Sequence, residues 1–516
     1  MNQTTDYDPL KDNAFFGHPK GLLICFATEL WERFSFYGMK YLLLLYLTKY
    51  HLFSDHAGLE VLGGYAALVY AMPVLGGLLA DRYLGMRKAV VFGGSLLVLG
   101  HLGMAFEGDQ ARLISGEIVR DNGALQVFYF SLALIVIGVG FLKPNISTIV
   151  GQLYGEDDPR RDSGFTIFYM GINLGAFAAT ILCGWLGEKY GWGYGFGAAG
   201  IGMLVGLCTF TFGQKHLHGY AEPDNPQLLK ERSPIGINKE FTIYLCGVVA
   251  VAVVWQMLQF HAVVSSTLNV MAIGVALGLV WFIAFRCDST ERSRMLVLMV
   301  LIVSTVVFWA LFEQSAASMT LFADRVMDRH LFGVELAPAQ FGAFNSLFIF
   351  LCAPFFAWLW TALNRRGLEP RTPVKFALGI AQAGLGFGAL VFGATHPDVS
   401  GKVAAWWMVL AYLLHTCGEL CLSPVGLSAV TRLSVHRVVG VMMGAWFLAT
   451  AYSEYVAVQL SKLAAVETID GTVTDVAVAL AGYTDLFTKL LYTGLGAGAI
   501  MLLISPLLIK MMKGVH

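Results

Sequence analysis

The stretch ELWERFSFYGMK at positions 29–40 places two carboxylates and two cations inside a long apolar run. Glu29, Glu32, Arg33 and Lys40 fall within one arc of a helix, at about 100° per residue. Charge inside a bilayer is costly, so this stripe has to face other helices or a water-filled cavity. A carboxylate beside a base in such a place can keep its ion pair or take up a proton. That choice is the chemistry of proton coupling.

The same stripe has a static interpretation, in which the ion pairs only fix the first helix to its neighbours. Buried ion pairs contribute little net stability compared with apolar side chains of similar volume. This comparison favours a functional role for the stripe.

Three further charges lie inside apolar runs: Lys143 in GFLKPNIS, Glu313 in FWALFEQS and Glu419 in CGELCLSP. Pro144 follows Lys143 directly, and Pro424 follows Glu419 by five residues. Proline inside a helix removes a hydrogen bond, so both helices are predicted to be kinked or locally unwound at these sites. Broken helices that expose backbone groups to a cavity are typical of transporter binding sites.

The intramembrane charges differ in sign between the two halves of the chain. Lys40 and Lys143 lie in the first half, and Glu313 and Glu419 lie in the second. A cavity between the halves would be bipolar, which suits a zwitterion with well-separated ends better than a simple anion or cation. Glu313 opposite Lys40 or Lys143 is the predicted proton switch.

The composition indicates a polytopic α-helical membrane protein. Of the 516 residues, 57% are hydrophobic and 13% are charged, about half the charged fraction of a soluble protein. Fourteen apolar runs are long enough to cross a bilayer. The predicted spans are 22–48, 58–80, 88–107, 125–150, 164–186, 195–213, 241–261, 267–285, 295–323, 340–364, 373–393, 403–430, 439–462 and 486–510.

Basic residues set the predicted orientation. Lys and Arg are concentrated in the loops on the N-terminal side, for example at Arg82, Arg87 and Lys88, so both termini are expected to be cytoplasmic. The first twenty residues have neither a basic n-region nor a small-residue cleavage site, so no signal peptide is expected.

Four segments are predicted. An N-terminal bundle of six helices covers 1–213, and a polar cytoplasmic linker covers 214–240. A transmembrane hairpin at 241–285 is inserted before a C-terminal six-helix bundle at 286–516. Two six-helix halves with substrate bound between them are a common transporter arrangement.

Other function classes lack their signatures. There is no GxxxxGK[ST] loop for ATP and no HExxH or GxSxG motif. A membrane enzyme using Glu313 or Glu419 as acid or base would lack a neighbouring nucleophile, metal cluster or cofactor motif. A substrate-sensing receptor would require a long cytoplasmic output domain, which is not evident. No cofactor is expected apart from the coupling proton.

Five motifs in order resemble those of the proton-dependent oligopeptide transporters of the major facilitator superfamily. ELWERF at 29–34 is similar to the ExxERF motif of that family's first helix, and FYMGINLGAF at 168–177 to its FYxxINxGS signature. GGLLADRYLGMRK at 76–88 resembles the superfamily's loop between helices two and three. FWALFEQ and GELCLSPVGL resemble patterns of the seventh and tenth core helices.

The resemblance implies a major facilitator fold with two six-helix bundles, an inserted hairpin and fourteen transmembrane helices. It also implies roles for individual residues. Lys40 stands where Arg is usual, so a point charge replaces a bidentate group. The implied proton-coupling residues are Glu29, Glu32, Arg33, Lys143 and Glu313. The implied substrate-binding residues are Tyr37, Lys40, Tyr70, Lys143, Asn173, Trp309, Asn345, Glu419, Ser423 and Trp446. Asp55 and Arg325 form a candidate gate near the extracellular ends of their helices.

The implied function is proton-coupled symport of di- and tripeptides into a bacterial cell, across the cytoplasmic membrane, by alternating access. The expected partners are peptides, protons and membrane lipid, with neither nucleic acid nor an obligate protein partner. The alternative is a proton-coupled carrier of another small solute, such as nitrate, a drug or an amino-acid derivative, on the same fold.

Overall fold

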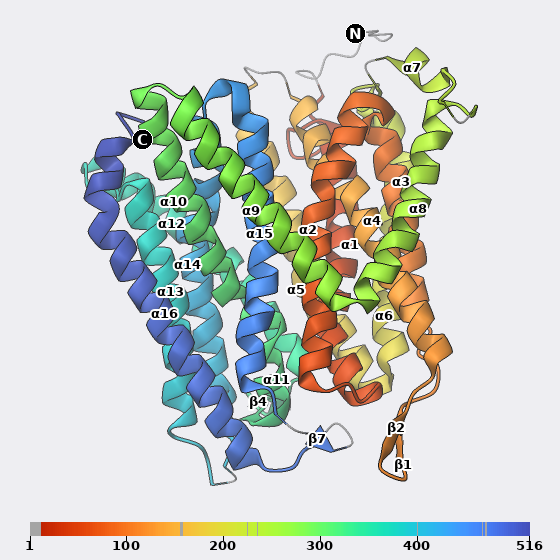
Figure 1. Cartoon of the computed structure of the whole chain (residues 1–516), viewed down its shortest axis with the longest axis vertical. Coiled ribbons are helices and arrows are strands. Elements are labelled where there is room, and N and C mark those ends of the chain that lie inside the picture. The colour runs from red at the N-terminus through yellow and green to blue at the C-terminus, as the bar shows by residue number, and fades with distance from the viewer. Residues whose placement is uncertain are drawn as a thin grey trace. The chain divides into compact units, whose positions relative to one another are not determined.

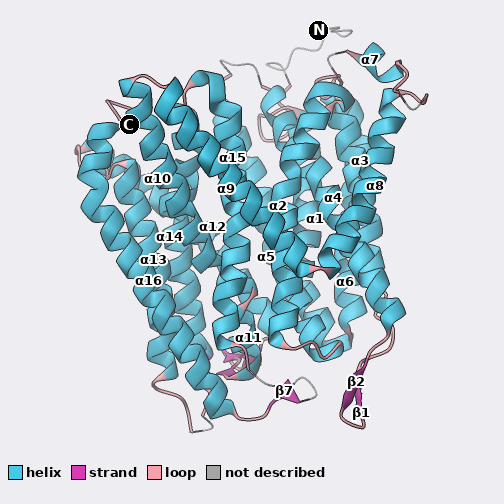
Figure 2. Ribbon diagram, in the orientation of Figure 1, coloured by secondary structure: helices cyan, strands magenta, loops and turns pink. Residues whose placement is uncertain are grey.

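The structure is a computed structural model that describes residues 12–154, 158–223, 225–234, 236–399, 401–466, 468–469 and 472–515. It is almost entirely helical, with four short two-stranded sheets (Figure 1; Figure 2). The helices of the first half are α1 (Lys20–Leu45), α2 (Asp55–Leu79), α3 (Met86–Met104), α4 (Asn122–Gln152), α5 (Arg161–Tyr190), α6 (Trp192–Gly213), α7 (Pro226–Lys230) and α8 (Lys239–Gln259). Those of the second half are α9 (His261–Arg286), α10 (Ser289–Phe312), α11 (Ser318–Arg325), α12 (Ala343–Arg365), α13 (Thr372–Ala394), α14 (Ala405–Leu433), α15 (Val439–Ser461) and α16 (Val476–Met511).

The strands lie in the segments that connect the helices. Antiparallel hairpins are formed by β1 (Arg112–Ile114) with β2 (Glu117–Val119), β4 (His330–Leu331) with β5 (Val334–Glu335), and β7 (Thr468–Ile469) with β8 (Thr472–Val473). The parallel pair joins β3 (Met327–Asp328) to β6 (Val403–Ala404).

Helices occupy all fourteen predicted spans, and most of their ends lie within six residues of the prediction. The exceptions are α16, which begins ten residues before its predicted start, and span 295–323, which contains two helices. Eleven helices of the described chain are both long enough and apolar enough to cross a membrane. The all-α membrane fold is therefore confirmed. The helices α1, α3 and α15 fall outside those eleven, so the full count of fourteen crossings stays a prediction.

The chain divides into two units. The first unit contains the residues up to Tyr46 together with Leu68–Phe260, and the second contains Leu47–Ala67 with His261–His516. The first half of α2 thus belongs to the second unit, and the rest of α2 belongs to the first.

Close backbone contacts hold the first unit together. There α1 packs against α5 and α6, and α3 packs against α4. A Cβ added at Gly175 of α5 would lie 2.1 Å from the carbonyl oxygen of Leu30, so only glycine lets α5 approach the charged turn of α1 this closely. The absence of a side chain at Gly175 therefore helps α5 to cover the predicted charge stripe.

Glycine also allows close helix packing in the second unit, around α13, which packs against α14 and α16 (Figure 1). A Cβ on Gly494 of α16 would lie 2.5 Å from the Cα of Gly384 on α13. The two helices therefore meet backbone to backbone. Elsewhere in this unit, α10 packs on α15 and α12 packs on α14.

The main interruption inside a predicted span is not at a proline. α4 and α14 continue as helices through Pro144 and Pro424, so the predicted local unwinding is wrong and a kink stays the prediction. Beside this proline, the Asn145 side chain donates from Nδ2 to Phe141 O at 2.6 Å. The break lies instead within span 295–323, where the 3₁₀ turn η5 (Glu313–Ala316) separates α10 from α11.

The predicted linker 214–240 folds onto the α2–α3 connection within the first unit. Lys88 Nζ lies 2.6 Å from Glu240 Oε2, and Arg87 forms an ion pair with Glu222. The linker also contains α7, whose first turn is capped by the Asn225 side chain.

The start of α1 is fixed by a polar clamp between α4 and α5. Arg160 Nη1 donates to Asn13 Oδ1 at 2.9 Å and to Gly17 O at 3.0 Å. Arg160 is itself held by Asp158, with Nη2 to Oδ2 at 2.8 Å. The hydrogen bond from Arg160 holds the pKa of Asp158 below its usual value of 3.8.

Asp158→Asn should therefore destabilise the protein at neutral pH by about 1–2 kcal/mol, seen as a Tm lower by a few degrees. A carboxyl whose pKa is lowered on folding contributes stability above its unfolded pKa and loses it as the pH falls through the folded value. The Tm difference between wild type and variant should thus be constant from pH 8 to pH 5 and shrink below the ordinary aspartate pKa. Asp162→Asn, which removes an exposed carboxylate from the first turn of α5, is the matched control. A Tm equal to that of wild type at pH 7 would contradict the clamp.

Candidate functional site

The first unit buries the predicted coupling residues of α1 as one cluster. Glu29, Glu32 and Arg33 are only 3%, 1% and 3% exposed. The Arg33 guanidinium is hydrogen-bonded to both carboxylate oxygens of Glu32, and its Nε lies 3.4 Å from Glu29 Oε1. One guanidinium therefore serves two carboxylates and is held mainly by Glu32.

The second oxygen of Glu29 is available for a proton. Glu29 Oε2 is buried and accepts no hydrogen bond from any residue in the described part of the chain. Lys143 of α4 is close enough to interact electrostatically with both Glu29 and Glu32. Glu29 is thus the less tightly held carboxylate of the pair.

Two of the predicted cations lie near the aromatic ring of Tyr70 on α2. Lys143 Nζ lies 4.8 Å from the centre of the Tyr70 ring, and Lys40 Nζ lies 5.9 Å from it. Lys40 also lies over the Phe36 ring at 5.8 Å. Aromatic faces attract ammonium groups without neutralising them, so neither ring contact cancels the positive charge of these lysines.

The cluster is positive overall. Its two carboxylates, Glu29 and Glu32, face three cations, Arg33, Lys40 and Lys143, which leaves a net charge of +1. This half of the predicted site therefore favours an anionic group.

Two predicted substrate residues complete the first unit's part of the site. Asn173 of α5 is buried and donates from Nδ2 to Tyr169 O at 3.1 Å. Tyr37 packs edge-on against Phe36 and stacks on Tyr41, with ring centroids 5.2 and 6.4 Å apart.

The second unit holds the predicted carboxylate of α14. Glu419 is 8% exposed, and its Oε2 accepts a hydrogen bond from Asn345 Nδ2 of α12 at 2.9 Å. Asn345 Nδ2 also donates to Thr416 Oγ1 at 3.1 Å. A neutral amide orients Glu419, and no cation pairs with it among the described residues. This half of the site favours a cationic group.

Glu313 lies where the helix breaks. It is the first residue of η5, and Glu419 is near enough to interact with it electrostatically. Trp309, one turn earlier on α10, packs against Phe312 with ring centroids 5.2 Å apart. Sequence reasoning placed Glu313 inside a continuous span. The run of small residues after it was the only available sign of the break.

Ser423 and Trp446 lie on the helices beside Glu419. Ser423 follows Glu419 by one turn on α14. Trp446 of α15 packs against Gly426, where a Cβ would lie 2.3 Å from the indole ring. The two predicted pocket residues are therefore brought to the same part of α14.

The candidate gate forms a buried network in the second unit. Arg325 Nη2 and Nη1 contact Asp55 Oδ1 and Oδ2 at 2.5 and 2.6 Å, and Arg325 Nη1 also donates to Tyr483 OH at 3.1 Å. The backbone N–H of Val466 donates to Asp55 Oδ2 at 2.9 Å. The predicted ion pair is thus present, and at 2% and 8% exposed its two members are buried rather than solvent-exposed.

Two further ion pairs hold the same segment, 47–67, and sequence reasoning missed them. Lys49 Nζ lies 2.8 Å from Asp324 Oδ1, and Lys462 Nζ lies 2.8 Å from Glu60 Oε1. All four residues lie near predicted helix ends, but nothing in their spacing identifies the partners. The predicted Lys143–Glu313 pair joins residues of different units and stays a prediction.

Comparison with known proteins identifies the family. The family model described as the POT family matches residues 87–477. The peptide transporter YePEPT of Yersinia enterocolitica is 38% identical over 85% of this chain and 86% of its own. A di-/tripeptide transporter of Lactococcus lactis is 35% identical over 88% of this chain and 91% of its own.

Solved structures that are similar to this chain point to the same family. The crystal structure of a peptide transporter POT in complex with sulfate is 36% identical and covers 99% of this chain and 100% of its own, with a TM-score of 0.80. A mutant of a peptide transporter POT in complex with alafosfalin gives the same identity, coverage and TM-score. The buried ExxER cluster, the order of the motifs and these matches lead to one conclusion: the chain belongs to the POT family of transporters.

Proposed function

We propose that this protein carries di- and tripeptides together with protons by alternating access. The observation that carries the proposal is the opposite charge of its two half-sites. The first unit gathers a cluster with a net charge of +1, and the second presents Glu419 oriented only by an amide among the described residues. A peptide in water carries a carboxylate at one end and an ammonium group at the other.

The peptide carboxylate is assigned to Lys40 and Lys143. Both ammonium groups lie near the Tyr70 ring, and three cations outnumber two carboxylates around them. An ammonium group is a point charge with rotating donors, so it accepts a carboxylate in several orientations. This tolerance suits a carrier whose substrates differ in length.

The peptide amino group is assigned to Glu419. Its carboxylate has one hydrogen bond from Asn345, which leaves acceptor capacity for an ammonium donor. Asn345 and Asn173 would bind backbone amides, and Tyr37, Trp309, Ser423 and Trp446 would line the pocket.

Proton uptake is assigned to Glu29, and the neighbouring charges of Glu32 and Arg33 influence how readily it takes up the proton. Protonation of Glu29 raises the charge of the cluster from +1 to +2 and so favours the peptide carboxylate at Lys143. Two unit charges about 8 Å apart interact by about 2 kcal/mol at an effective dielectric constant of about 20. Binding free energies couple reciprocally, so the peptide carboxylate favours the proton by the same amount. Release would follow when Lys143 pairs with Glu313.

The network of Asp55, Arg325 and Tyr483 is assigned as the extracellular gate. Its bidentate geometry, its burial and the two neighbouring ion pairs support a latch that keeps segment 47–67 in the second unit.

The membrane arrangement follows the sequence analysis. The boundaries 1–213, 214–240, 241–285 and 286–516, the cytoplasmic termini and a bacterial inner-membrane location are part of this proposal. The names of the two bacterial relatives support peptides over nitrate or drugs as the solute.

Purified protein in liposomes should accumulate labelled dialanine when an inward proton gradient is imposed. Unlabelled tripeptide should compete for this uptake, and nitrate should not. A proton ionophore should abolish the accumulation. Gradient-driven uptake of nitrate or a drug in place of dialanine would overturn the peptide assignment.

Glu32→Gln should abolish gradient-driven uptake and retain part of the peptide counterflow. The neutral amide no longer holds Arg33, which then pairs with Glu29 and keeps that carboxylate ionised. Glu117→Gln, on the exposed β1–β2 hairpin, is the matched control and should behave as wild type. Gradient-driven uptake by Glu32→Gln at the wild-type rate would show that the cluster has no part in coupling.

Asp55→Asn should weaken the gate. Loss of one partner leaves the buried Arg325 charge uncompensated, which costs about 3–5 kcal/mol. The variant should show a lower Tm, slower uptake and faster hydrogen–deuterium exchange in segment 47–67. The double variant Asp55→Asn/Arg325→Gln should recover much of the Tm but not the slow exchange.

The control for this gate is Asp485→Asn, which breaks the exposed pair of Asp485 and Lys489 on α16 and should change the free energy of unfolding by less than about 1 kcal/mol. Wild-type exchange in segment 47–67 of Asp55→Asn would refute the latch.

A further inference from the structure

The second residue of the turn η5, Gln314, has a completely buried side chain, 0% exposed. A carboxamide has two N–H donors and an oxygen that can accept two hydrogen bonds. Here Nε2 donates to Ala310 O at 3.2 Å and to Ala457 O at 2.8 Å. Oε1 accepts from Ser318 Oγ at 2.5 Å and from Ser461 Oγ at 2.7 Å. All four hydrogen-bonding positions of the amide are therefore in use.

These four bonds join both sides of the helix break to α15. Ala310 lies on α10 before the break and Ser318 on α11 after it, whereas Ala457 and Ser461 are one turn apart at the end of α15. Ser461 Oγ is also 2.9 Å from Ala457 O, but that carbonyl already accepts from Gln314, and the contact with the amide is the shorter one. The end of α15 thus offers one acceptor and one donor to the same amide, which fixes the plane of that group.

The same end of α15 leads into the contacts of the proposed gate. Ser461 is directly followed by Lys462, whose Nζ lies 2.8 Å from Glu60 Oε1. A few residues further on, the backbone N–H of Val466 donates to Asp55 Oδ2 at 2.9 Å. Both carboxylates belong to the first half of α2. One short stretch of chain therefore contacts the gate on one side and the helix break on the other, within the second unit.

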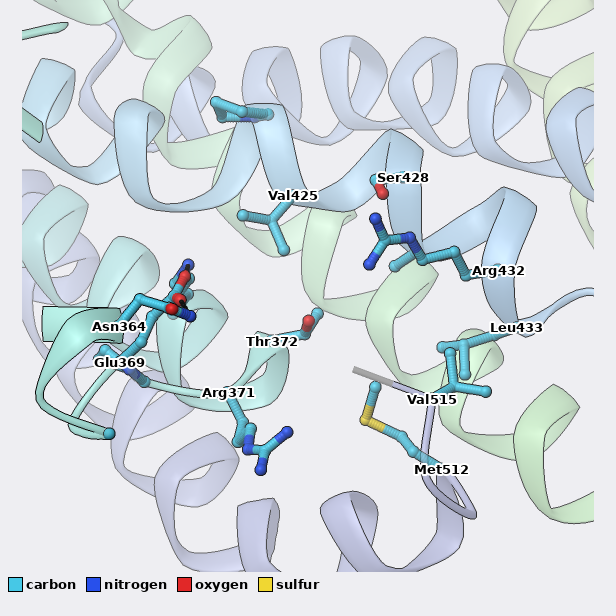
Figure 3. Close-up of a pocket in the computed structure, with 15 residues that line it drawn as sticks. Asn364, Glu369, Arg371, Thr372, Val425, Ser428, Arg432, Leu433, Met512 and Val515 are labelled. Atoms are coloured by element: carbon cyan, nitrogen blue, oxygen red, sulfur yellow. Dashed lines mark hydrogen bonds and ion pairs between the residues drawn. The ribbon is translucent and has the colours of Figure 1, made fainter. Parts of the chain in front are cut away.

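The polar groups beside the cavity in Figure 3 have a more local role. This cavity, of about 520 Å³, lies between the turn that joins α12 to α13 and the last turns of α14. Glu369 Oε1 lies 2.6 Å from Lys375 Nζ, and Glu369 Oε2 accepts from Asn364 Nδ2 at 2.6 Å. These bonds hold one turn between two consecutive helices. Their loss should therefore reach neither the gate nor the break.

We propose that Gln314 is a positioning residue that transmits the state of the gate to the helix break at Glu313. When the gate releases α2, the end of α15 loses two partners and is free to shift. Ala457 and Ser461 then move, and the amide of Gln314 has to follow, because a buried donor or acceptor left without a partner is costly. Glu313 is the next residue in the chain, so its carboxylate moves as well. Energetic coupling of this kind passes through hydrogen-bond networks and rigid helices.

The inference rests on the proposed function in one respect, which is the pairing of Glu313 with Lys143 during the transport cycle. The setting of Glu313 would then depend on whether the gate is closed. Peptide release on the inner side would be linked to closure on the outer side through one amide.

Two serines allow a matched test of this link. Ser461→Ala and Ser318→Ala each remove one hydroxyl from the same oxygen of Gln314, but only Ser461 belongs to α15. Hydrogen–deuterium exchange is measured on the purified full-length protein with and without the gate variant Asp55→Asn. The ratio of the two exchange rates, in each serine background, reports how strongly a segment responds to the gate.

In the protein with both serines, Asp55→Asn should accelerate exchange in segment 47–67 and, by about fivefold, in segment 309–318, as expected for members of one network. The Ser461→Ala background should reduce the response of segment 309–318 to less than about twofold and keep that of segment 47–67. The Ser318→Ala background should keep both responses. Glu369→Gln, which breaks the bonds beside the cavity in Figure 3, controls for general loosening of the unit and should change neither segment.

The milder gate variant Lys462→Gln, which breaks the pair with Glu60, keeps the test decisive if Asp55→Asn fails to fold. No acceleration in segment 309–318 with either gate variant would overturn the proposal, and so would an acceleration that survives Ser461→Ala. These measurements use neither peptide nor a proton gradient. Their failure would leave peptide symport untouched, and a failure of dialanine uptake by the wild type would leave the exchange result standing.

The pH profile separates positioning from a purely structural role. In liposomes, Ser461→Ala should shift the external pH at which gradient-driven dialanine uptake is half-maximal, and Ser318→Ala should not. The KM for dialanine counterflow should stay within about twofold of wild type in both variants, because neither serine is assigned to the peptide. A loss of uptake by Ser461→Ala that is equal at every pH would show that this network supports the fold without setting Glu313.

Discussion

The cost of placing charge inside apolar helices governs the design of this protein. Each carboxylate or cation removed from water loses hydration worth several kcal/mol, and close partners restore it only when the geometry is good. On α1 the partners of the buried charges come from the same helix, because Arg33 lies within one turn of both Glu29 and Glu32. That arrangement leaves one oxygen of Glu29 without a hydrogen bond from the described residues, which is why proton uptake is proposed for this carboxylate. A fully paired cluster would be more stable and would have no second state.

The same constraint explains how lysines and carboxylates are distributed. Lys40 and Lys143 are placed near aromatic rings, which partly stabilise an ammonium group. Glu419 is held by an amide, which orients a carboxylate without neutralising it. These contacts are the reason why Lys143 and Glu419 are assigned to the two charged ends of a peptide in the proposed function.

Much of this arrangement could be predicted from the sequence, because it depends on short-range periodicity. The fourteen helices follow from the length of apolar runs, and the stripe of Glu29, Glu32 and Arg33 follows from 3.6 residues per turn. The break at Glu313 was missed because no proline or glycine marks it, and the two prolines that suggested unwinding lie in continuous helices. The ion pairs of Lys49 and Lys462 were missed for another reason. Their partners are hundreds of residues away in sequence or on separate helices, and a single sequence carries no signal for such pairings.

The course of α2 has a mechanical consequence. One continuous helix from Asp55 to Leu79 belongs to the second unit up to Ala67 and to the first unit from Leu68 onward. A helix resists bending, so it acts as a rod whose two ends are mounted on different bodies. In the proposed transport cycle, rocking of one body against the other would have to flex this rod, or release its first half from the ion pairs of Asp55 and Glu60. Switching between states would therefore require either the bending of one helix or the breaking of these buried and half-buried ion pairs.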